Sequence, residues 1–247
     1  MMLEVEGLTK SFGGLLAVND VSFKIKEKEL SAIIGPNGAG KTTLFNLLTG
    51  EIRPDSGRII FNGKDITRLP SHTICRGGVA RSFQRLNIFP RLSAFENVQV
   101  ALFSAQRKSG NLFSRAEKMA REETGEILES VGLYDKQGVR AGLLAHGDQK
   151  RLELAIALAS QPELLLLDEP TAGMSPKETI EAVELIRKEV KDRGLSLIFV
   201  EHDMSVVFGI ADNIKVMYQG RMIFQGEPGE ARAHDKVQSI YLGGAKI

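Results

Sequence analysis

Short apolar runs that end abruptly in glycine-rich or acidic segments recur along this chain of 247 residues. Residues 30–34 (LSAII) form such a run, and they are followed by GPNGAGKTT and then by apolar residues at helical spacing in LFNLLTG. This order predicts a strand, a glycine loop and a helix. Residues 164–167 are wholly apolar, and residues 196–200 (SLIFV) are apolar after Ser196, which indicates strands buried on both faces. The spacing predicts a helix over 176–191 between them.

The opening region is rich in predicted strands. Residues 3–5 and 21–25 alternate apolar and polar positions on either side of the turn-like Gly13-Gly14, and residues 58–61 follow a Pro-Asp-Ser-Gly turn. The middle of the chain instead shows helical spacing over 94–103 and over 112–131, and the polar segment SAQRKSGN between them is a predicted loop. We interpret residues 85–161 as a helical insertion.

The alternation of strands and helices predicts an α/β fold whose parallel sheet is covered on both faces. Because domains commonly contain about 100 to 200 residues, the length predicts one large domain or a domain that carries an insertion. We therefore predict a single domain over 1–247, with a core formed by 1–84 and 162–247 and an inserted helical subdomain at 85–161.

Composition narrows the classes of function. The chain has 32 Lys and Arg against 31 Asp and Glu, so its net charge of +1 gives no electrostatic reason to expect a nucleic-acid partner. A single cysteine, Cys75, excludes an internal disulfide, and the four histidines show no metal-ligand spacing. No stretch approaches the roughly 18 uninterrupted apolar residues of a membrane span, and no basic and apolar leader opens the chain. We therefore expect a cytosolic protein.

The glycine loop matches the pattern G-x-x-x-x-G-K-[S/T] of phosphate-binding loops, and it stands where that mechanism needs it, between a strand and a helix. Its backbone N–H groups turn toward phosphates, Lys41 neutralises the outer phosphates, and the Thr42 hydroxyl is a ligand for Mg²⁺. A chance glycine turn is the alternative, and the flanking elements disfavour it. The predicted nucleotide-binding residues are Gly35, Pro36, Asn37, Gly38, Ala39, Gly40, Lys41, Thr42 and Thr43.

Polar residues follow the strands predicted at 164–167 and 196–200. Asp168 ends LLLLD and is the predicted metal-shell carboxylate, and Glu169 follows it as the candidate base that polarises water. His202, just past the second strand, is a candidate to orient that water or to contact the γ-phosphate. The alternatives are a charged exit from a strand for Asp168 and Glu169, and a purely structural histidine for His202.

The order of these motifs resembles the ATP-binding cassette (ABC) ATPases over nearly the whole chain, through GPNGAGKTT, LLLLDEPTAG and VEHD. The resemblance implies a P-loop NTPase (RecA-like) core with an N-terminal antiparallel β region and an inserted α-helical subdomain, which binds ATP and Mg²⁺. It further implies that Phe12 stacks on adenine, and that Gln84 senses magnesium and touches a transmembrane partner. A core or edge aromatic and a solvated loop residue are the respective alternatives.

The family also carries a signature, commonly L-S-G-G-Q, that binds the γ-phosphate of ATP held by a second cassette. The aligned segment here is Leu144 followed by Ala145, His146, Gly147 and Asp148. Asp148 places a negative charge near a polyphosphate, so we expect it to cap the helix that begins there, to point away from the phosphate, or to pair with a cation such as Lys150 or Arg151. Ser175 stands where the family usually has an aspartate that reaches across the dimer.

The nearest resemblance within the family is to the ATPase subunits of branched-chain amino acid importers, carried by RSFQRLNIFPRLSAFENV, AHGDQKRLELA, DEPTAGMSPKE and VEHDMSVV. It implies a second ATPase subunit in a head-to-tail homodimer or heterodimer, and an external substrate-binding protein. It also implies a place on the inner face of the cell membrane, beside permeases. We expect apolar side chains such as Phe89, Leu92 and Phe95 to contact these permeases. The alternatives are another transported substrate (urea or amides, lipopolysaccharide), a soluble cassette that acts on ribosomes or DNA, and an unrelated glycine-loop kinase or GTPase.

Overall fold

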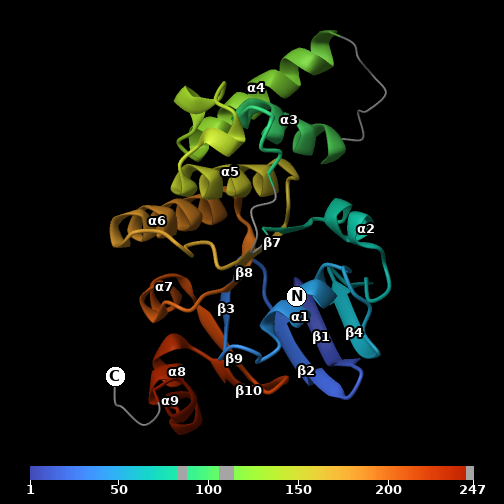
Figure 1. Cartoon of the computed structure of the whole chain (residues 1–247). Helices are drawn as coiled ribbons and strands as arrows, with labels where there is room; N and C mark the ends of the chain where they lie inside the picture. The colour runs from blue at the N-terminus through green and yellow to red at the C-terminus, as the bar shows by residue number, and fades with distance from the viewer. Residues whose placement is uncertain (83–87, 106–113, 243–247) are drawn as a thin grey trace.

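Two β-sheets and a group of helices at one end make up the molecule (Figure 1). The structure is a computed structural model that describes residues 1–82, 88–105 and 114–242. The smaller sheet is antiparallel, with strand order β2-β1-β4-β5. Its strands are β1 (Leu3–Phe12), β2 (Leu15–Ile25), β4 (Ser56–Phe61) and β5 (Lys64–Asp65). The predicted antiparallel N-terminal region is confirmed.

The second half of β1 and the first half of β2 were not predicted from the alternation of apolar and polar residues. The pairing of these two strands shifts register between Val5 and Leu8, between Leu8 and Lys10, and between Lys10 and Ser11. The buried positions change parity once in each strand, after Val5 in β1 and after Val18 in β2, so a period of two does not persist through the segment. The chain nevertheless turns at Gly13-Gly14, as predicted.

The larger sheet has six strands in the order β10-β9-β3-β8-β7-β6. All neighbouring strands are parallel except β10, which pairs antiparallel with β9 at the edge of the sheet. The strands are β3 (Leu30–Ile34), β6 (Val79–Arg81), β7 (Leu164–Asp168), β8 (Ser196–Val200), β9 (Asn213–Tyr218) and β10 (Arg221–Gly226). The strands β3, β7 and β8 were predicted to within one residue at each end, because each is a short run with at most one polar residue.

Side chains from both faces of this sheet are buried, as predicted. Along β8, Leu197 and Phe199 belong to one core cluster, whereas Ile198 and Val200 belong to the other. The first cluster lies against helices of the C-terminal half and the insertion, and the second packs the sheet against α1 and the antiparallel sheet. The helices outside the insertion are α1 (Lys41–Leu48), α2 (Ser71–Arg76), α6 (Pro176–Arg193), α7 (Met204–Ile210), α8 (Pro228–Ala233) and α9 (Asp235–Leu242).

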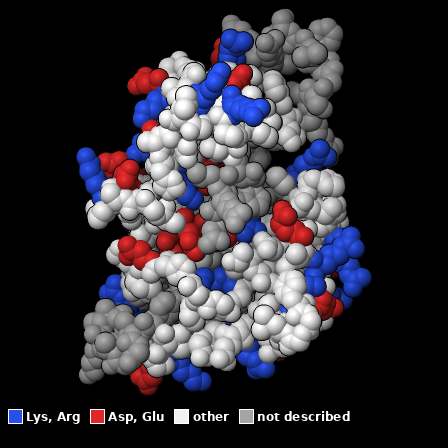
Figure 2. Space-filling model, viewed as in Figure 1, with Lys and Arg blue, Asp and Glu red and all other residues white. Residues whose placement is uncertain are grey.

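The predicted helical insertion contains three longer helices that stack at one end of the molecule (Figure 1). They are α3 (Ala94–Ala105), α4 (Ser114–Ser130) and α5 (His146–Ala159), with the short 3-10 helices η1 (Tyr134–Lys136) and η2 (Ala141–Leu143) before α5. None of the described helices is both long enough and apolar enough to cross a membrane. Lys and Arg side chains mingle with Asp and Glu over the face shown in Figure 2.

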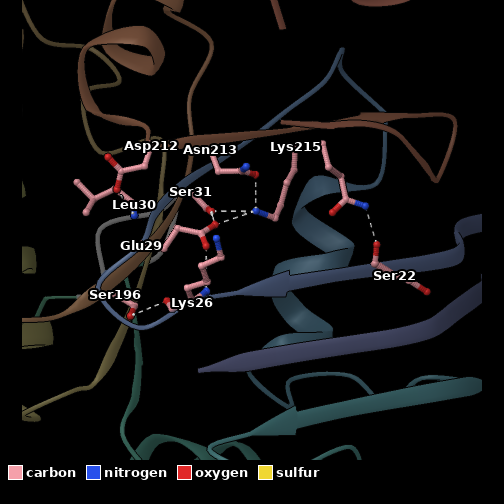
Figure 3. A network of polar contacts seen from close by, with 10 residues as sticks. Ser22, Lys26, Glu29, Leu30, Ser31, Ser196, Asp212, Asn213 and Lys215 are labelled. Carbon is pink, nitrogen blue, oxygen red and sulfur yellow. Dashed lines mark hydrogen bonds and ion pairs between the residues drawn. The ribbon is translucent and has the colours of Figure 1, made fainter. Parts of the chain in front are cut away.

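A buried polar cluster connects β3 to β9 (Figure 3). Lys215 is 1% exposed, and its Nζ donates to Ser31 Oγ at 2.9 Å, to Asn213 Oδ1 at 2.8 Å and to Glu29 Oε1 at 3.2 Å. The same Glu29 oxygen accepts the Ser31 hydroxyl. The amine therefore has three oxygen partners, as a buried ammonium group requires. This cluster fixes β9 beside the strand that leads into the glycine loop.

Candidate nucleotide-binding site

The glycine loop occupies the turn between β3 and α1. Gly40 has a φ of +102°, and a Cβ atom at this position would lie 2.3 Å from the carbonyl oxygen of Ala17 on β2. A side chain here is excluded both by the conformation and by the close approach of the backbone. The helix that follows begins at Lys41, so its first N–H groups point into the loop.

Lys41 lies inside this loop, where its Nζ donates to the carbonyl oxygens of Gly35 at 2.6 Å and Pro36 at 3.1 Å. Burial lowers the pKa of Lys41 from its usual value, although the negative charges of Glu169 and Asp168 act in the opposite direction. The carboxylates that were predicted from two distant parts of the chain are therefore electrostatically coupled to the loop lysine.

An open cleft of about 600 Å³ adjoins the loop. Nine of the predicted residues line it: Asn37, Gly38, Ala39, Gly40, Lys41, Thr42, Thr43, Glu169 and His202. The lining also includes six residues that the sequence analysis missed: Leu15, Leu16, Ala17, Val200, Gln219 and Gly220. The signal for these was weak, because five of them reach the cleft only through the packing of β2 and of the β9–β10 turn against the loop. Val200 reaches it as the last residue of β8.

Glu169 and His202 meet at this cleft, because β7 and β8 are parallel neighbours that end at the same edge of the sheet. The His202 Nε2 atom lies 3.2 Å from Glu169 Oε1. Glu169 has a φ of +52°, which is unusual for a residue with a side chain, and its N–H donates to the Val200 carbonyl oxygen at 2.9 Å. Strained backbone of this kind is common at functional sites, where the surrounding structure holds it in place.

The neighbouring Glu201 is a further residue that the sequence analysis missed. Its side chain is buried, and it accepts hydrogen bonds from the N–H and the hydroxyl of Thr171, at 2.9 and 2.7 Å. The other carboxylate oxygen accepts the N–H of His202 at 3.1 Å. Glu201 therefore holds the segment after Glu169 against the segment that carries His202.

Asp168 lies deeper than Glu169 and is not among the residues that line the cleft. It is 2% exposed, and its Oδ2 accepts a hydrogen bond from Arg81 Nη2 at 3.0 Å. Arg81 was not predicted, although it ends the strand β6 that pairs with β7. The Thr42 hydroxyl and the Asp168 carboxylate are hard oxygen donors of the kind that Mg²⁺ prefers, so the chemistry of this donor set fits the ion.

Phe12, the predicted adenine contact, is not one of the described residues that line the cleft. It is 49% exposed at the end of β1 and pairs with Leu15, which does line the cleft, while Lys10 Nζ lies 5.6 Å from its ring centroid. Gln84 lies outside the residues that the structure describes. Of the apolar residues predicted to contact a permease, Phe89 is 54% exposed, whereas Phe95 packs against the core of the insertion.

The predicted signature segment lies at the start of α5, apart from the cleft of its own chain. His146 Nε2 is 3.1 Å from the Ala172 carbonyl oxygen, so the signature touches the loop that leads to Ser175. Ser175 caps α6, accepting the N–H of Glu178 in a reciprocal capping box. The two segments that the family resemblance places across the dimer are therefore in contact within this chain.

Asp148 has a cation partner, as expected, but it does not cap α5 and its partner is neither Lys150 nor Arg151. Ala145, and not Asp148, is the N-cap of α5, because the helix begins two residues earlier than the charge pattern indicated. The Asp148 carboxylate pairs with Lys136 of η1, whereas Lys150 lies 3.6 Å from Glu153 and Arg151 lies 2.9 Å from Glu181. A cation distant by 12 residues in sequence offsets the negative charge at the helix start.

Comparison with known proteins identifies the family. Residues 18–172 match the family model described as ABC transporter. The chain is 43% identical, over 99% of its length and 98% of theirs, to the high-affinity branched-chain amino acid transport ATP-binding proteins BraF of Pseudomonas aeruginosa and LivG of Salmonella typhimurium. It is 33% identical over 98% of its length to the lipopolysaccharide export system ATP-binding protein LptB of Acidithiobacillus ferridurans, of which it covers 97%.

Solved structures agree with this result. A nucleotide-free ATP-binding cassette from an ABC transporter has a TM-score of 0.85 at 29% identity, covering 98% of this chain and 99% of that one. A cassette in its ADP conformation also has a TM-score of 0.85, at 31% identity and 98% coverage of both chains. The chain belongs to the ABC transporter family. It is an ATP-hydrolysing nucleotide-binding cassette with a P-loop NTPase fold, as the order of its motifs predicted.

Proposed function

We propose that this chain is the ATPase subunit of a transporter that imports branched-chain or related amino acids. The observation that carries the ATPase chemistry is the meeting of Glu169 and His202, 3.2 Å apart, at the cleft beside the glycine loop. The proposed substrate rests on the relatives named as branched-chain amino acid transport proteins, which match nearly the full length of the chain. Another cargo, such as lipopolysaccharide, is the second candidate because of the weaker match to LptB.

In this proposal the loop residues 35–43 bind the phosphates of ATP. Lys41 exchanges its present partners, the carbonyl oxygens of Gly35 and Pro36, for phosphate oxygens. Glu169 accepts the proton of the attacking water, and His202 orients Glu169 and the γ-phosphate. Thr42 and Asp168 hold Mg²⁺, which when bound neutralises charge on the phosphates. Phe12 and Gln84 are proposed to contact adenine and the magnesium shell.

The signature residues 145–148 are proposed to serve ATP held by a second cassette, in a head-to-tail dimer. The start of α5 presents backbone N–H groups to an anion, and Gly147 permits a close approach. Lys136 reduces the repulsion between Asp148 and a phosphate, because it lies against that carboxylate. The proposed core, 1–84 and 162–247, binds nucleotide, and the proposed insertion, 85–161, carries the signature.

The proposed assembly contains a second ATPase subunit, two permeases and an external binding protein, and this chain lies on the cytoplasmic face of the membrane. ATP drives closure only to the extent that it binds the closed dimer more tightly than the open one. Exposed Phe89 is proposed to contact a permease. Hydrolysis then returns the cassettes to the open state.

Sedimentation velocity on the Glu169→Gln variant with saturating ATP, over a concentration series, tests the site. The substitution removes the base but keeps the volume of the side chain, so a closed dimer persists. An ATP-dependent homodimer means that this chain forms both sites alone. A monomer that binds ATP means that a different cassette is required. Failure to bind ATP contradicts the proposal.

Uptake of radiolabelled leucine tests the cargo, in vesicles that contain the complete proposed assembly of this chain, its second ATPase subunit, its permeases and the external binding protein. The expected result is ATP-dependent uptake that Glu169→Gln abolishes and that unlabelled isoleucine or valine inhibits. ATP hydrolysis without leucine uptake would retain the ATPase assignment and reject the proposed substrate. The matched control is Glu184→Gln, on an exposed position of α6.

A further inference from the structure

Arg81 connects three elements beneath the glycine loop. From the end of β6, its Nη2 donates to Asp168 Oδ2 on β7 at 3.0 Å, and its Nη1 donates to Asn46 Oδ1 on α1 at 2.5 Å. Its guanidinium carbon lies 5.5 Å from the ring centroid of Phe45. The side chains of Arg81 and Asp168 are only 6% and 3% exposed. A buried cation therefore faces the carboxylate that we assign to the metal.

A guanidinium group carries a permanent positive charge in proteins. A carboxylate as buried as Asp168 is costly to leave without a positive partner. Arg81 supplies that partner, because its Nη2 lies 3.0 Å from Asp168 Oδ2. The pair also lies against α1, the helix whose first residues, Lys41 and Thr42, line the nucleotide cleft.

Asp168 ends β7 directly before Glu169, which lines the nucleotide cleft together with Lys41. An uncompensated carboxylate at this position would repel the triphosphate that Lys41 is proposed to bind. The Arg81 charge offsets this repulsion before a metal ion arrives.

We propose that Arg81 is a positioning residue that holds the Asp168 carboxylate and neutralises its charge in the metal-free site, so that ATP binds there in the absence of Mg²⁺. The inference rests on the proposed function, since it requires that Asp168 belong to the metal shell. A purely structural role for Arg81 predicts that its loss weakens nucleotide binding equally with and without metal. The proposed role predicts an unequal loss.

The experiment measures the Kd of ATP for the full chain by calorimetry, once in EDTA and once with excess Mg²⁺. Arg81→Gln keeps polar contacts and removes the charge, and we expect its metal-free Kd to rise on the order of tenfold. The Kd with Mg²⁺ changes much less, because the metal ion supplies positive charge at Asp168. Arg81→Lys keeps the charge, so its ratio of the two Kd values stays near that of the unmodified chain.

Two further variants make the test specific. Arg193→Gln removes a guanidinium that also pairs with a carboxylate, Glu189 at 2.8 Å, and it should leave both Kd values unchanged. The double variant Arg81→Gln/Asp168→Asn contains neither buried charge, so it should fold and regain the metal-free affinity of the unmodified chain. If Arg81→Gln is unfolded, this double variant decides the question, because a metal-free affinity that is still weakened in it contradicts the proposal.

The outcomes separate the inference from the proposed function. The proposed role of the Arg81 charge is overturned if Arg81→Gln weakens ATP binding by the same factor in EDTA and in Mg²⁺. It is also overturned if the ratio of the Kd in EDTA to the Kd in Mg²⁺ rises equally in Arg81→Gln and Arg81→Lys. An unmodified chain that binds no ATP under either condition contradicts the nucleotide site itself. If the single variant Asp168→Asn has the same ratio of the two Kd values as the unmodified chain, Asp168 is not the metal-shell residue.

Discussion

Lys215 is fully buried, and its three hydrogen bonds to oxygen atoms show why one residue can stabilise two strands. We expect Lys215→Met to reduce the free energy of unfolding by about 2 to 4 kcal/mol, because it leaves the Glu29 carboxylate without its buried cation. Chemical denaturation measures this value. The control is Lys24→Met, since Lys24 pairs with Glu4 at the surface, and its loss should reduce the stability much less than Lys215→Met does. Equal costs for the two variants would contradict the importance of burial.

At the same scale, Asp55 predicts a dependence of stability on pH. Hydrogen bonds from the side chain of Lys10 and from the side chain and backbone of Ser11 lower the pKa of Asp55 from 3.8 to about 2. The folded state therefore binds this proton less readily than the unfolded state. The stabilisation by Asp55 is complete above pH 3.8 and is lost as the pH falls toward 2.

A carbon-detected NMR titration of the Asp55 carboxyl group checks this value directly. In denaturation experiments, the difference in stability between the unmodified chain and Asp55→Asn should shrink as the pH falls from 4 to 2. Asp65→Asn offers a comparison at a second exposed carboxyl group, whose pKa is lowered by hydrogen bonds from Thr67. A carboxyl resonance that titrates near 3.8 would show that the contacts with Lys10 and Ser11 do not persist in solution.

At the scale of elements, the β9–β10 turn braces the glycine loop. The Gly220 N–H donates to the Ala39 carbonyl oxygen at 3.0 Å, and the Gly220 carbonyl oxygen accepts the N–H of Asn19 at 2.8 Å. The φ of Gly220 is +78°, and a Cβ atom there would lie 3.0 Å from the carbonyl oxygens of Leu16 and Ala17. The turn therefore holds both the loop and the wall of the cleft that β2 provides.

We expect Gly220→Ala to displace this turn and to raise the Kd of ATP by roughly tenfold. Without the turn's support, part of the free energy of ATP binding is used to order the glycine loop. The matched control is Gly63→Ala. Gly63 also has a positive φ, of +75°, but no atom lies within 4 Å of the position of its Cβ atom. Both variants carry similar backbone strain, so only Gly220→Ala should affect nucleotide affinity. Titration calorimetry measures both, and an equal effect would assign the loss to strain alone.

Sequence patterns predicted some elements well and others poorly, for physical reasons. The strands β3, β7 and β8 are buried on both faces, so their composition alone marks them. The glycine loop was clear because its glycines are required by local geometry. Arg81 and Glu201 could not be found in this way, because each acts through a partner on a distant segment of the chain, Asp168 on β7 and Thr171 in the turn after β7. The partner of Asp148 was missed for the same reason, since Lys136 comes from a separate 3-10 helix.

At the scale of the whole molecule, nine of the residues proposed for the chain's own nucleotide line one cleft, while the signature lies elsewhere, at the start of α5. Its negative charge, Asp148, is paired with the half-exposed Lys136. If this segment meets the triphosphate of a second cassette, the pair decides the sign of the local charge. Lys136→Glu would replace one compensated carboxylate by two uncompensated ones.

We therefore expect Lys136→Glu, in the Glu169→Gln background, to weaken ATP-dependent association with the partner cassette by about tenfold or more, because like charges would then approach the phosphates. The Kd of ATP for the isolated chain should not change, since Lys136 does not line its cleft. Lys177→Glu is the control, because that lysine is 89% exposed on α6 and lies 4.0 Å from its nearest carboxylate. Sedimentation velocity measures association, and calorimetry measures ATP binding. Undiminished association of the Lys136→Glu variant would mean that Asp148 points away from the bound phosphates, so that α5 would approach the second nucleotide through its backbone alone.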